Sequence, residues 1–251
     1  MRAGCPVPAV STEPGARPPE PLILAAPGRD AAAAAAVAAL TAVVLIVAAD
    51  RAALAHIQRV DDSWLRLMVS WREGPVTVIA KVFNVLGLVY VTLPARIAVA
   101  GYLAVRRRWW HCAAFVAAVV LSEILIGPLK GAYDRARPPG SLVATSGASF
   151  PSGHSIAASV TVLAAVIALV PAGRRRVAWG LAGAAFAAAM ALSRAYLAAH
   201  WLSDAIAGLL LGTACALAAA TAVDQAQRRW RRRRTLRADP SRPAPRPAER
   251  P

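Results

Sequence analysis

The feature that most constrains this chain is a series of long apolar stretches with few charged residues. The first of them, Ala31–Ala49, carries no charged side chain over 19 residues. An α-helix of that length crosses about 30 Å of hydrocarbon at about 1.5 Å per residue. The hydrophobic fraction of 57% and the mean hydropathy of +0.48 also exceed those of an ordinary soluble domain. We therefore expect an all-α polytopic membrane protein.

Five more apolar stretches follow, so the sequence predicts six transmembrane helices. The further segments are Val85–Val105, Cys112–Leu129, Ser155–Gly173, Val177–Ser193 and Ala205–Val223. A cleaved signal peptide is the alternative for the first stretch. A retained span is favoured there, because the stretch is long, begins about thirty residues into the chain and lacks a compact basic leader.

The segment Asp61–Asn84, between the first two predicted spans, mixes Trp, Leu, Met and Val with Arg and Lys. This pattern predicts either an interfacial amphipathic helix above the outer leaflet or an ordinary helix in a soluble loop.

The net charge of +16 first suggests nucleic acid, but the distribution of arginine favours a topological role. Three clusters, Arg106–Arg108, Arg174–Arg176 and Arg228–Arg234, follow or separate the spans so that all three fall on one side of a six-span bundle. The positive-inside rule places that side in the cytoplasm. We expect a multi-pass plasma-membrane protein with both termini cytoplasmic and no nucleic-acid partner.

Composition divides the chain into three regions. Residues 1–30 are rich in Pro and Ala and have little periodicity, and residues 224–251 are basic and rich in Pro. Both are predicted to be cytoplasmic tails, disordered at the two ends of the chain. Residues 31–223 then form the membrane domain.

Two short polar blocks on either side of the loop before the fourth span have side chains that suit phosphate chemistry. Lys130 and Arg137 offer a point charge and a forked guanidinium to phosphate oxygens; as an alternative, they mark only the membrane boundary. In the second block Ser152 is placed to cap the fourth span, so the free N–H groups there form an anion site next to Gly153 and His154. A plain helix cap with an incidental histidine is the alternative.

The third block contains Arg194, His200 and Asp204. His200 and Asp204 are four residues apart and so share one face of a helix if the sixth span begins near Trp201. A carboxylate there can hold one imidazole nitrogen as a donor and leave the other free as a nucleophile. No cluster with metal-ligand spacing accompanies these residues in the sequence.

Taken together, the pattern Lys-x6-Arg-Pro, Pro-Ser-Gly-His and Ser-Arg-x5-His-x3-Asp resembles the signature of the type 2 phosphatidic acid phosphatase superfamily. That superfamily includes bacterial acid phosphatases and vanadium haloperoxidases. The signature covers residues 130–204, and the arrangement of spans extends the resemblance to about residues 31–223.

The resemblance implies a helical core whose active site lies where the third-to-fourth and fifth-to-sixth loops meet. It further implies that His200 attacks phosphorus while Asp204 orients it, and that His154 is the acid for the leaving group and then the base for water. The phosphoryl oxygens would be bound, without metal or cofactor, by Lys130, Arg137, Ser152, the N–H of Gly153, and Arg194.

Two charged residues lie outside the signature but inside predicted spans. Glu123 precedes Lys130 by seven residues, so the two share nearly the same helix face and Glu123 could support Lys130. Arg96 lies midway along the second span, where an isolated charge is costly. An ion pair between Arg96 and Glu123 is the favoured interpretation.

The sequence therefore predicts a membrane lipid phosphate phosphatase that acts at the outer face through a phosphohistidine. Candidate substrates are phosphatidic acid, phosphatidylglycerophosphate and polyprenyl phosphates or diphosphates. One alternative is a vanadate-dependent haloperoxidase, although the soluble architecture typical of that branch is absent. Another is a non-catalytic lipid-binding or transport relative, which the completeness of the histidine and aspartate set disfavours. Neither the lipid nor the oligomeric state is indicated.

Overall fold

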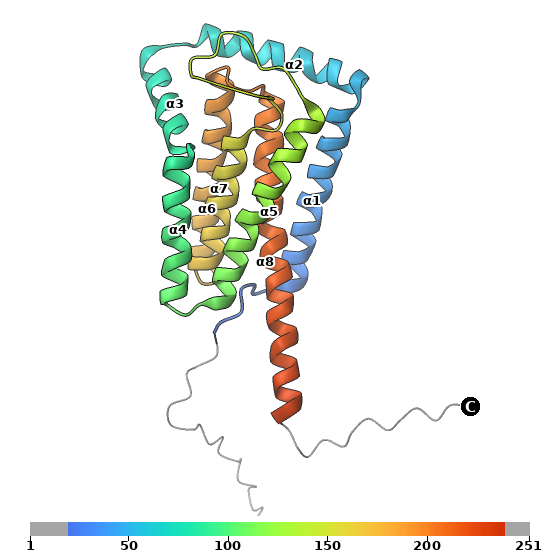
Figure 1. The fold of residues 1–251 in the computed structure, drawn as a ribbon, viewed down its shortest axis with the longest axis vertical. Coiled ribbons are helices and arrows are strands. Elements are labelled where there is room, and N and C mark those ends of the chain that lie inside the picture. The colour runs from blue at the N-terminus through green and yellow to red at the C-terminus, as the bar shows by residue number, and fades with distance from the viewer. Residues whose placement is uncertain (1–19, 239–251) are drawn as a thin grey trace, which may run out of the picture.

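The fold, in a computed structural model that describes residues 20–238, consists of helices joined by loops (Figure 1). No strand occurs in that range, which confirms the predicted all-α class. The helices are α1 (Pro27–Ala49), α2 (Arg51–Ser70), α3 (Gly74–Leu86), α4 (Val89–Val105), α5 (Trp109–Tyr133), α6 (Gly153–Leu169), α7 (Arg174–Tyr196) and α8 (Leu202–Ala238).

The long helices form a bundle suited to a bilayer. Four of those described, α1, α5, α7 and α8, are long and apolar enough to cross a membrane, and α3 with α4 makes a fifth crossing if this pair, bent by 54°, is one broken span. The shorter α6, with 17 residues, packs inside the bundle. It ends at Leu169, before the predicted Gly173, because the residue preceding Pro171 is disfavoured in helical conformation. The count of six spans therefore depends on α6 and on the broken pair.

The segment Asp61–Asn84 belongs to two helices with different directions. Helix α2 lies across one end of the bundle, and α3 turns down along its side (Figure 1). Asp50 starts α2 by accepting the N–H of Ala52 at 2.9 Å, which is a standard N-cap contact. The second predicted span, Val85–Val105, is interrupted at Gly87, where a Cβ would lie 2.3 Å from the ring of His154. This break lets α3 approach the start of α6.

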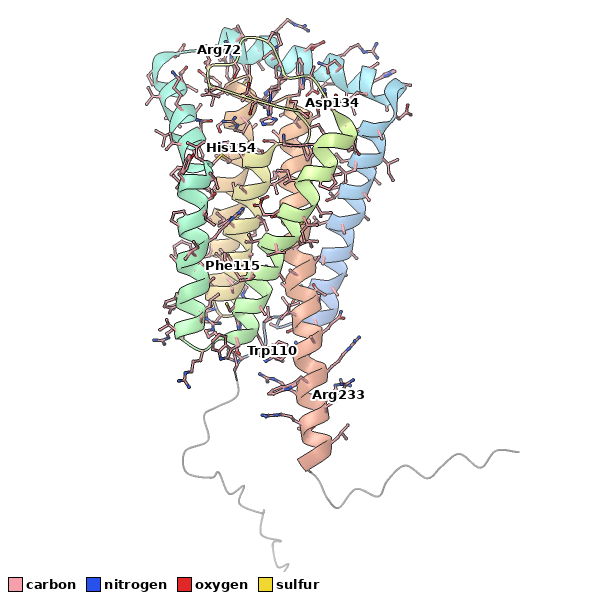
Figure 2. The ribbon with its side chains drawn as sticks, in the orientation of Figure 1. Arg72, Trp110, Phe115, Asp134, His154 and Arg233 are labelled. Carbon is pink, nitrogen blue, oxygen red and sulfur yellow. The ribbon has the colours of Figure 1, made fainter. Side chains whose placement is uncertain are left out.

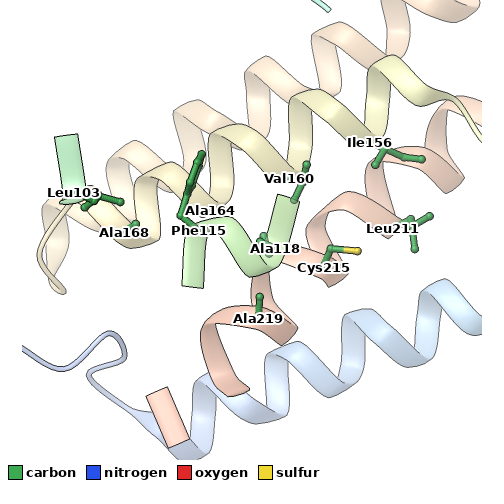
Figure 3. Close-up of a cluster of buried hydrophobic side chains, with 11 residues drawn as sticks. Leu103, Phe115, Ala118, Ile156, Val160, Ala164, Ala168, Leu211, Cys215 and Ala219 are labelled. Carbon is green, nitrogen blue, oxygen red and sulfur yellow. The ribbon is translucent and has the colours of Figure 1, made fainter. Parts of the chain in front are cut away.

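Small residues hold α6 close to α8. A Cβ at Gly208 would lie 2.5 Å from the carbonyl oxygen of Ser152, and one at Gly212 would lie 2.0 Å from Ser159 Oγ. Glycines four apart on one helix face permit this backbone approach. Figure 3 shows the apolar cluster that fills the remaining space, where Phe115 and Val160 are almost fully buried. The close contact brings the first turns of α6 and α8 together.

The two ends of the bundle differ in charge. The loops after α5 and α7 meet under α2 at one end, whereas the connections after α4 and α6 and the basic part of α8 lie at the other (Figures 1 and 2).

Of the predicted tails, residues 20–30 are packed against the helices: Leu24 N donates to Asp224 at 3.0 Å, and Glu20 lies 2.6 Å from His111 Nδ1. Helix α8 also continues beyond the predicted boundary at 223. Residues 1–19 and 239–251 of those tails lie outside the described residues.

Candidate active site

His200 lies in the short connection between α7 and α8, and both of its ring nitrogens have specific neighbours. Nδ1 is 2.7 Å from the main-chain oxygen of Ser149, and Nε2 is 3.3 Å from Nη1 of Arg137. A carbonyl oxygen only accepts and a guanidinium only donates. These partners assign the proton to Nδ1 and leave a lone pair on Nε2.

Burial lowers the pKa of His200 to about 4. The negative charge of Asp204 opposes this shift, while the positive charges of Arg194 and Arg137 add to it. The imidazole is 4% exposed and therefore neutral at physiological pH. A neutral ring with an unprotonated Nε2 is the form in which histidine acts as a nucleophile.

Asp204, in the first turn of α8, lies beside His200 without being its closest partner. Its Oδ2 is 3.7 Å from His200 Nδ1, which is beyond hydrogen-bond distance. The same oxygen accepts from Trp201 N at 2.9 Å and from the hydroxyl of Ser149, while Oδ1 accepts from Arg135 at 2.7 Å. Asp204 thus acts on the imidazole through its charge and through Ser149.

Two of the predicted phosphate-binding cations meet at the loop between α5 and α6. Lys130 Nζ donates to Ala148 O at 2.6 Å, and Arg137 Nη2 reaches the same oxygen at 3.2 Å. Arg137 also donates to Gly147 O at 2.9 Å and to Ala199 O at 2.6 Å. Gly147 has φ +64°, a conformation that costs glycine little. The loop backbone therefore fixes the guanidinium against His200.

Arg194 and His154 are joined by a residue that the sequence did not single out, Asn84 at the end of α3. Arg194 Nη1 donates to the side-chain oxygen of Asn84, and His154 Nε2 lies 3.2 Å from its main-chain oxygen. Arg194 is 2% exposed, and its Nε has no hydrogen-bond partner within the described part of the chain. That N–H is available to an anionic ligand.

Ser152 and Gly153 occupy the start of α6, as expected from the sequence. Ser152 stands at the N-cap, but its side chain makes no capping hydrogen bond and instead accepts from Ser155 Oγ at 3.0 Å. Its N–H donates to the main-chain oxygen of Asp204 at 3.0 Å. A Cβ on Gly153 would lie 3.2 Å from Ile126, so the backbone there is closely approached.

Glu123 is paired with Arg96 and not with Lys130. Arg96 Nη1 donates to Glu123 at 2.7 Å, and Arg96 Nε donates to Thr161 at 2.9 Å. Of the two interpretations of Glu123, the structure shows the interhelical ion pair. Arg96, Glu123 and Gly153 line a small cavity of about 160 Å³.

Sequence reasoning missed Ser149, Asn84 and Arg135. Ser149 contacts His200 through its main-chain carbonyl. Every residue has such a carbonyl, so the sequence does not distinguish Ser149 as a site residue. Arg135 is two residues before Arg137 and was visible as a third cation in that block. Among residues 20–238 no group of three His, Cys, Asp or Glu side chains could hold a metal ion.

Comparisons with known proteins agree with this architecture. The model of the PAP2 superfamily matches residues 109–228. A transmembrane PAP2-type phosphatidylglycerolphosphate phosphatase from Bacillus subtilis has a similar fold, with a TM-score of 0.66 and 19% identity over 83% of this chain and 98% of that one. The Aquifex aeolicus protein LpxE superposes with a TM-score of 0.52 and 22% identity over 62% of this chain and 91% of that one. No curated protein sequence matches.

A helical membrane bundle with a phosphate-binding signature across the loops at one end defines a class of membrane phosphatases. Within that class, the PAP2 superfamily model matches residues 109–228, the part of the chain that carries the signature from Lys130 to Asp204.

Proposed function

We propose that the protein hydrolyses a phosphomonoester or diphosphate of a membrane lipid through a phosphohistidine on His200. The observation that carries the proposal is the geometry of that imidazole. Nδ1 is held by Ser149 O at 2.7 Å, while Nε2 keeps its lone pair beside Arg137. In-line attack on phosphorus needs such an oriented nucleophile together with cations for the equatorial oxygens.

In the first step the Nε2 lone pair forms a bond to phosphorus and the ester P–O bond breaks. The electron pair of that bond stays on the leaving oxygen, which takes a proton from His154; this step needs the imidazolium form of His154, which the negative charge of the bound phosphate favours. Lys130, Arg137 and the unpartnered Nε–H of Arg194 bind the phosphoryl oxygens, whose negative charge they stabilise in the transition state.

In the second step water attacks the phosphohistidine. His154, now neutral, takes a proton from that water, and the P–N bond breaks with its electron pair returning to Nε2. Inorganic phosphate leaves, and both histidines regain their starting protonation states. All the groups required belong to the chain itself, so we propose a metal-independent reaction.

An apolar cavity near the site supports a lipid as the substrate. A cavity of about 560 Å³, lined mainly by apolar side chains of α2, α3 and α7, includes Phe83 and Ser193 in its wall. Asn84 and Arg194 are the next residues in the chain after Phe83 and Ser193, which supports a lipid whose apolar chain lies in this cavity and whose phosphate binds on the Arg194 side of the site. Phosphatidic acid, phosphatidylglycerophosphate and polyprenyl phosphates or diphosphates all combine such a chain with a phosphate group.

We further propose that the site faces the outside of the cell and that both termini are cytoplasmic. The arginine clusters near Arg107, Arg175 and Arg231 lie at the end of the bundle opposite the site loops (Figures 1 and 2). Basic residues accumulate on the cytoplasmic side of membrane proteins.

Phosphate release by the purified protein tests the proposal. The substrates are phosphatidic acid, phosphatidylglycerophosphate, a polyprenyl diphosphate and an aryl phosphate in detergent, with EDTA or vanadate in parallel samples. We expect release with at least one lipid, unchanged by EDTA, inhibited by vanadate and absent in His200→Ala. The matched control is His56→Ala, which removes an exposed histidine of α2. Turnover that required a divalent ion, or that persisted in His200→Ala, would contradict the mechanism.

A further inference from the structure

A buried ion network outside the signature connects the lateral helix α2 to the catalytic carboxylate. Arg135, in the loop after α5, donates through Nη1 to Asp204 Oδ1 at 2.7 Å and through Nη2 to Asp61 Oδ2 at 2.8 Å. The same guanidinium donates to Ser203 Oγ at 2.7 Å and to Gln58 Oε1 at 2.6 Å. Its side chain is 9% exposed, and those of Asp61 and Asp204 are 1% and 0% exposed. One guanidinium therefore serves two buried carboxylates.

Asp61 also holds the start of α8. Its Oδ1 accepts from Ser203 N at 2.9 Å, and its Oδ2 accepts from Ser203 Oγ at 2.6 Å. A carboxylate at the free N–H groups of a helix start acts as a cap and suits the local dipole. Because Asp204 is the next residue, Asp61 fixes the turn of α8 that carries Asp204.

The electrostatics of this arrangement require Arg135. A fully buried carboxylate without a positive partner destabilises the folded protein. Removing one partner of a buried ion pair leaves such an uncompensated charge. Only the planar guanidinium fork can bind the two carboxylates, one through each terminal nitrogen. Trp201, whose ring centroid is 5.5 Å from the Arg135 guanidinium carbon, packs beside it. Lysine at this position would keep the charge but could not reproduce the fork.

We propose that Arg135, held by Asp61, is a positioning residue for phosphoryl transfer. It fixes Asp204, Asp204 holds the Ser149 hydroxyl, and the Ser149 carbonyl orients His200. The inference rests on the function proposed above. Within residues 20–238, the side-chain hydrogen bonds of Arg135 go to Ser203, Asp204, Gln58 and Asp61, and none goes to an imidazole. Its loss therefore affects the attacking nitrogen and not the binding of the phosphate.

The test compares Arg135→Gln, Arg135→Lys and Asp61→Asn with wild type. Asp62→Asn is the matched control, because it makes the same charge change at the next residue of α2, while the oxygen of the new amide can still accept from Gln58 Nε2, as Asp62 Oδ1 does at 2.8 Å. The measurements are kcat and KM on an aryl phosphate and on the preferred lipid, and the shift in thermal unfolding midpoint that inorganic phosphate produces. That shift reports an intact phosphate site without depending on turnover.

We expect Arg135→Gln to lower kcat by about 10²-fold, the size of effect that follows from small misplacements of a reacting group. KM and the shift with inorganic phosphate should stay within about twofold of wild type, as is expected when transition-state interactions alone are lost. The kcat of Arg135→Lys should be higher than that of Arg135→Gln but lower than that of wild type. The kcat of Asp61→Asn should lie between those of Arg135→Lys and wild type, and the kcat of Asp62→Asn should equal that of wild type. If Arg135→Gln gives no folded protein, the comparison rests on Arg135→Lys and Asp61→Asn.

Two results would overturn the inference while leaving the proposed function intact. In the first, wild type is active and the kcat of Arg135→Gln equals that of Asp62→Asn. In the second, Arg135→Gln raises KM and leaves kcat unchanged, which would make Arg135 a substrate-binding residue. A wild type that releases no phosphate and shows no shift with inorganic phosphate would overturn the proposed function, and this inference with it.

Discussion

The Nδ1 atom of His200 lies 2.7 Å from the main-chain oxygen of Ser149, closer than the 3.7 Å that separates it from Asp204. The carbonyl fixes the tautomer, so the aspartate is left to supply charge and to hold Ser149 in place. This division of roles changes what is expected of an amide at position 204.

Asp204→Asn should therefore lower kcat by about 10²-fold, less than the about 10⁴-fold loss typical when a triad amide imposes the wrong tautomer. The amide removes the negative charge that stabilises a positive imidazole, and it takes from Arg135 one of its two carboxylate partners, Asp61 being the other. The purified variant is assayed on an aryl phosphate. A loss as complete as that of His200→Ala would show that Asp204 sets the tautomer after all.

The two histidines should be separable by the choice of leaving group. His200→Ala should abolish turnover and the acid-labile phosphoenzyme on every substrate. His154→Ala should lose about 10²- to 10⁴-fold on a lipid phosphate but much less on an aryl phosphate, whose leaving oxygen scarcely needs a proton. Rapid-quench trapping measures the intermediate. Equal losses of His154→Ala on both substrates would remove its role as the acid.

The glycines of α8 should tolerate no side chain. Gly208→Ala places a methyl group 2.5 Å from the carbonyl oxygen of Ser152, which must push α6 from α8. We expect activity to fall more than 10-fold and the protein to lose about 1–3 kcal/mol, as for overpacked cores. Gly101→Ala, with nothing within 4 Å of its Cβ, is the control and should be neutral or slightly stabilising. Thermal unfolding in detergent and phosphate release measure the two effects; equal behaviour of both variants would contradict the packing argument.

The pH dependence should reflect the buried neutral His200. Its pKa is about 4 in the folded protein and about 6.5 in the unfolded chain. Between these values the unfolded chain binds a proton that the native state does not. The stabilisation that His200 contributes to the free energy of unfolding is therefore fully present above pH 6.5. It is lost as the pH falls towards 4, by at most about 1.4 kcal/mol per pH unit.

The measurement is the unfolding midpoint from pH 7.5 to 5 for wild type and His200→Gln, since the difference cancels the other titrating groups. The midpoint of wild type should fall more steeply with decreasing pH. Phosphoenzyme formation should meanwhile persist at pH 5.5, where a free imidazole would be mostly protonated. Parallel curves for the two proteins would show that His200 titrates normally.

The proposed orientation predicts opposite labelling of the two ends of the bundle. Thr145→Cys lies in the exposed loop before α6, and Arg175→Cys lies in the basic cluster that begins α7. With the native cysteines replaced, a membrane-impermeant thiol reagent should modify position 145 in intact cells and position 175 only after lysis. The reverse pattern would place the site in the cytoplasm.

The sequence by itself determined the all-α membrane class, because apolar length and charge-free composition leave few other ways to bury those segments. It also identified the signature residues from Lys130 to Asp204, since binding phosphate and attacking phosphorus each require a particular kind of side chain. The interruption of a predicted span at Gly87 was not foreseen, because its reason is the ring of His154, about seventy residues away in the chain.

Only the tertiary structure decided how those residues are connected. The partner of His200 Nδ1 is a backbone oxygen, and every residue has one, so no sequence pattern distinguishes Ser149. The bridge from Asp61 to Asp204 through Arg135 spans 143 positions and exists because α2 lies across the end of the bundle. Hydrogen bonds between residues so distant along the chain depend on how the helices pack, and the packing is a property of the whole fold.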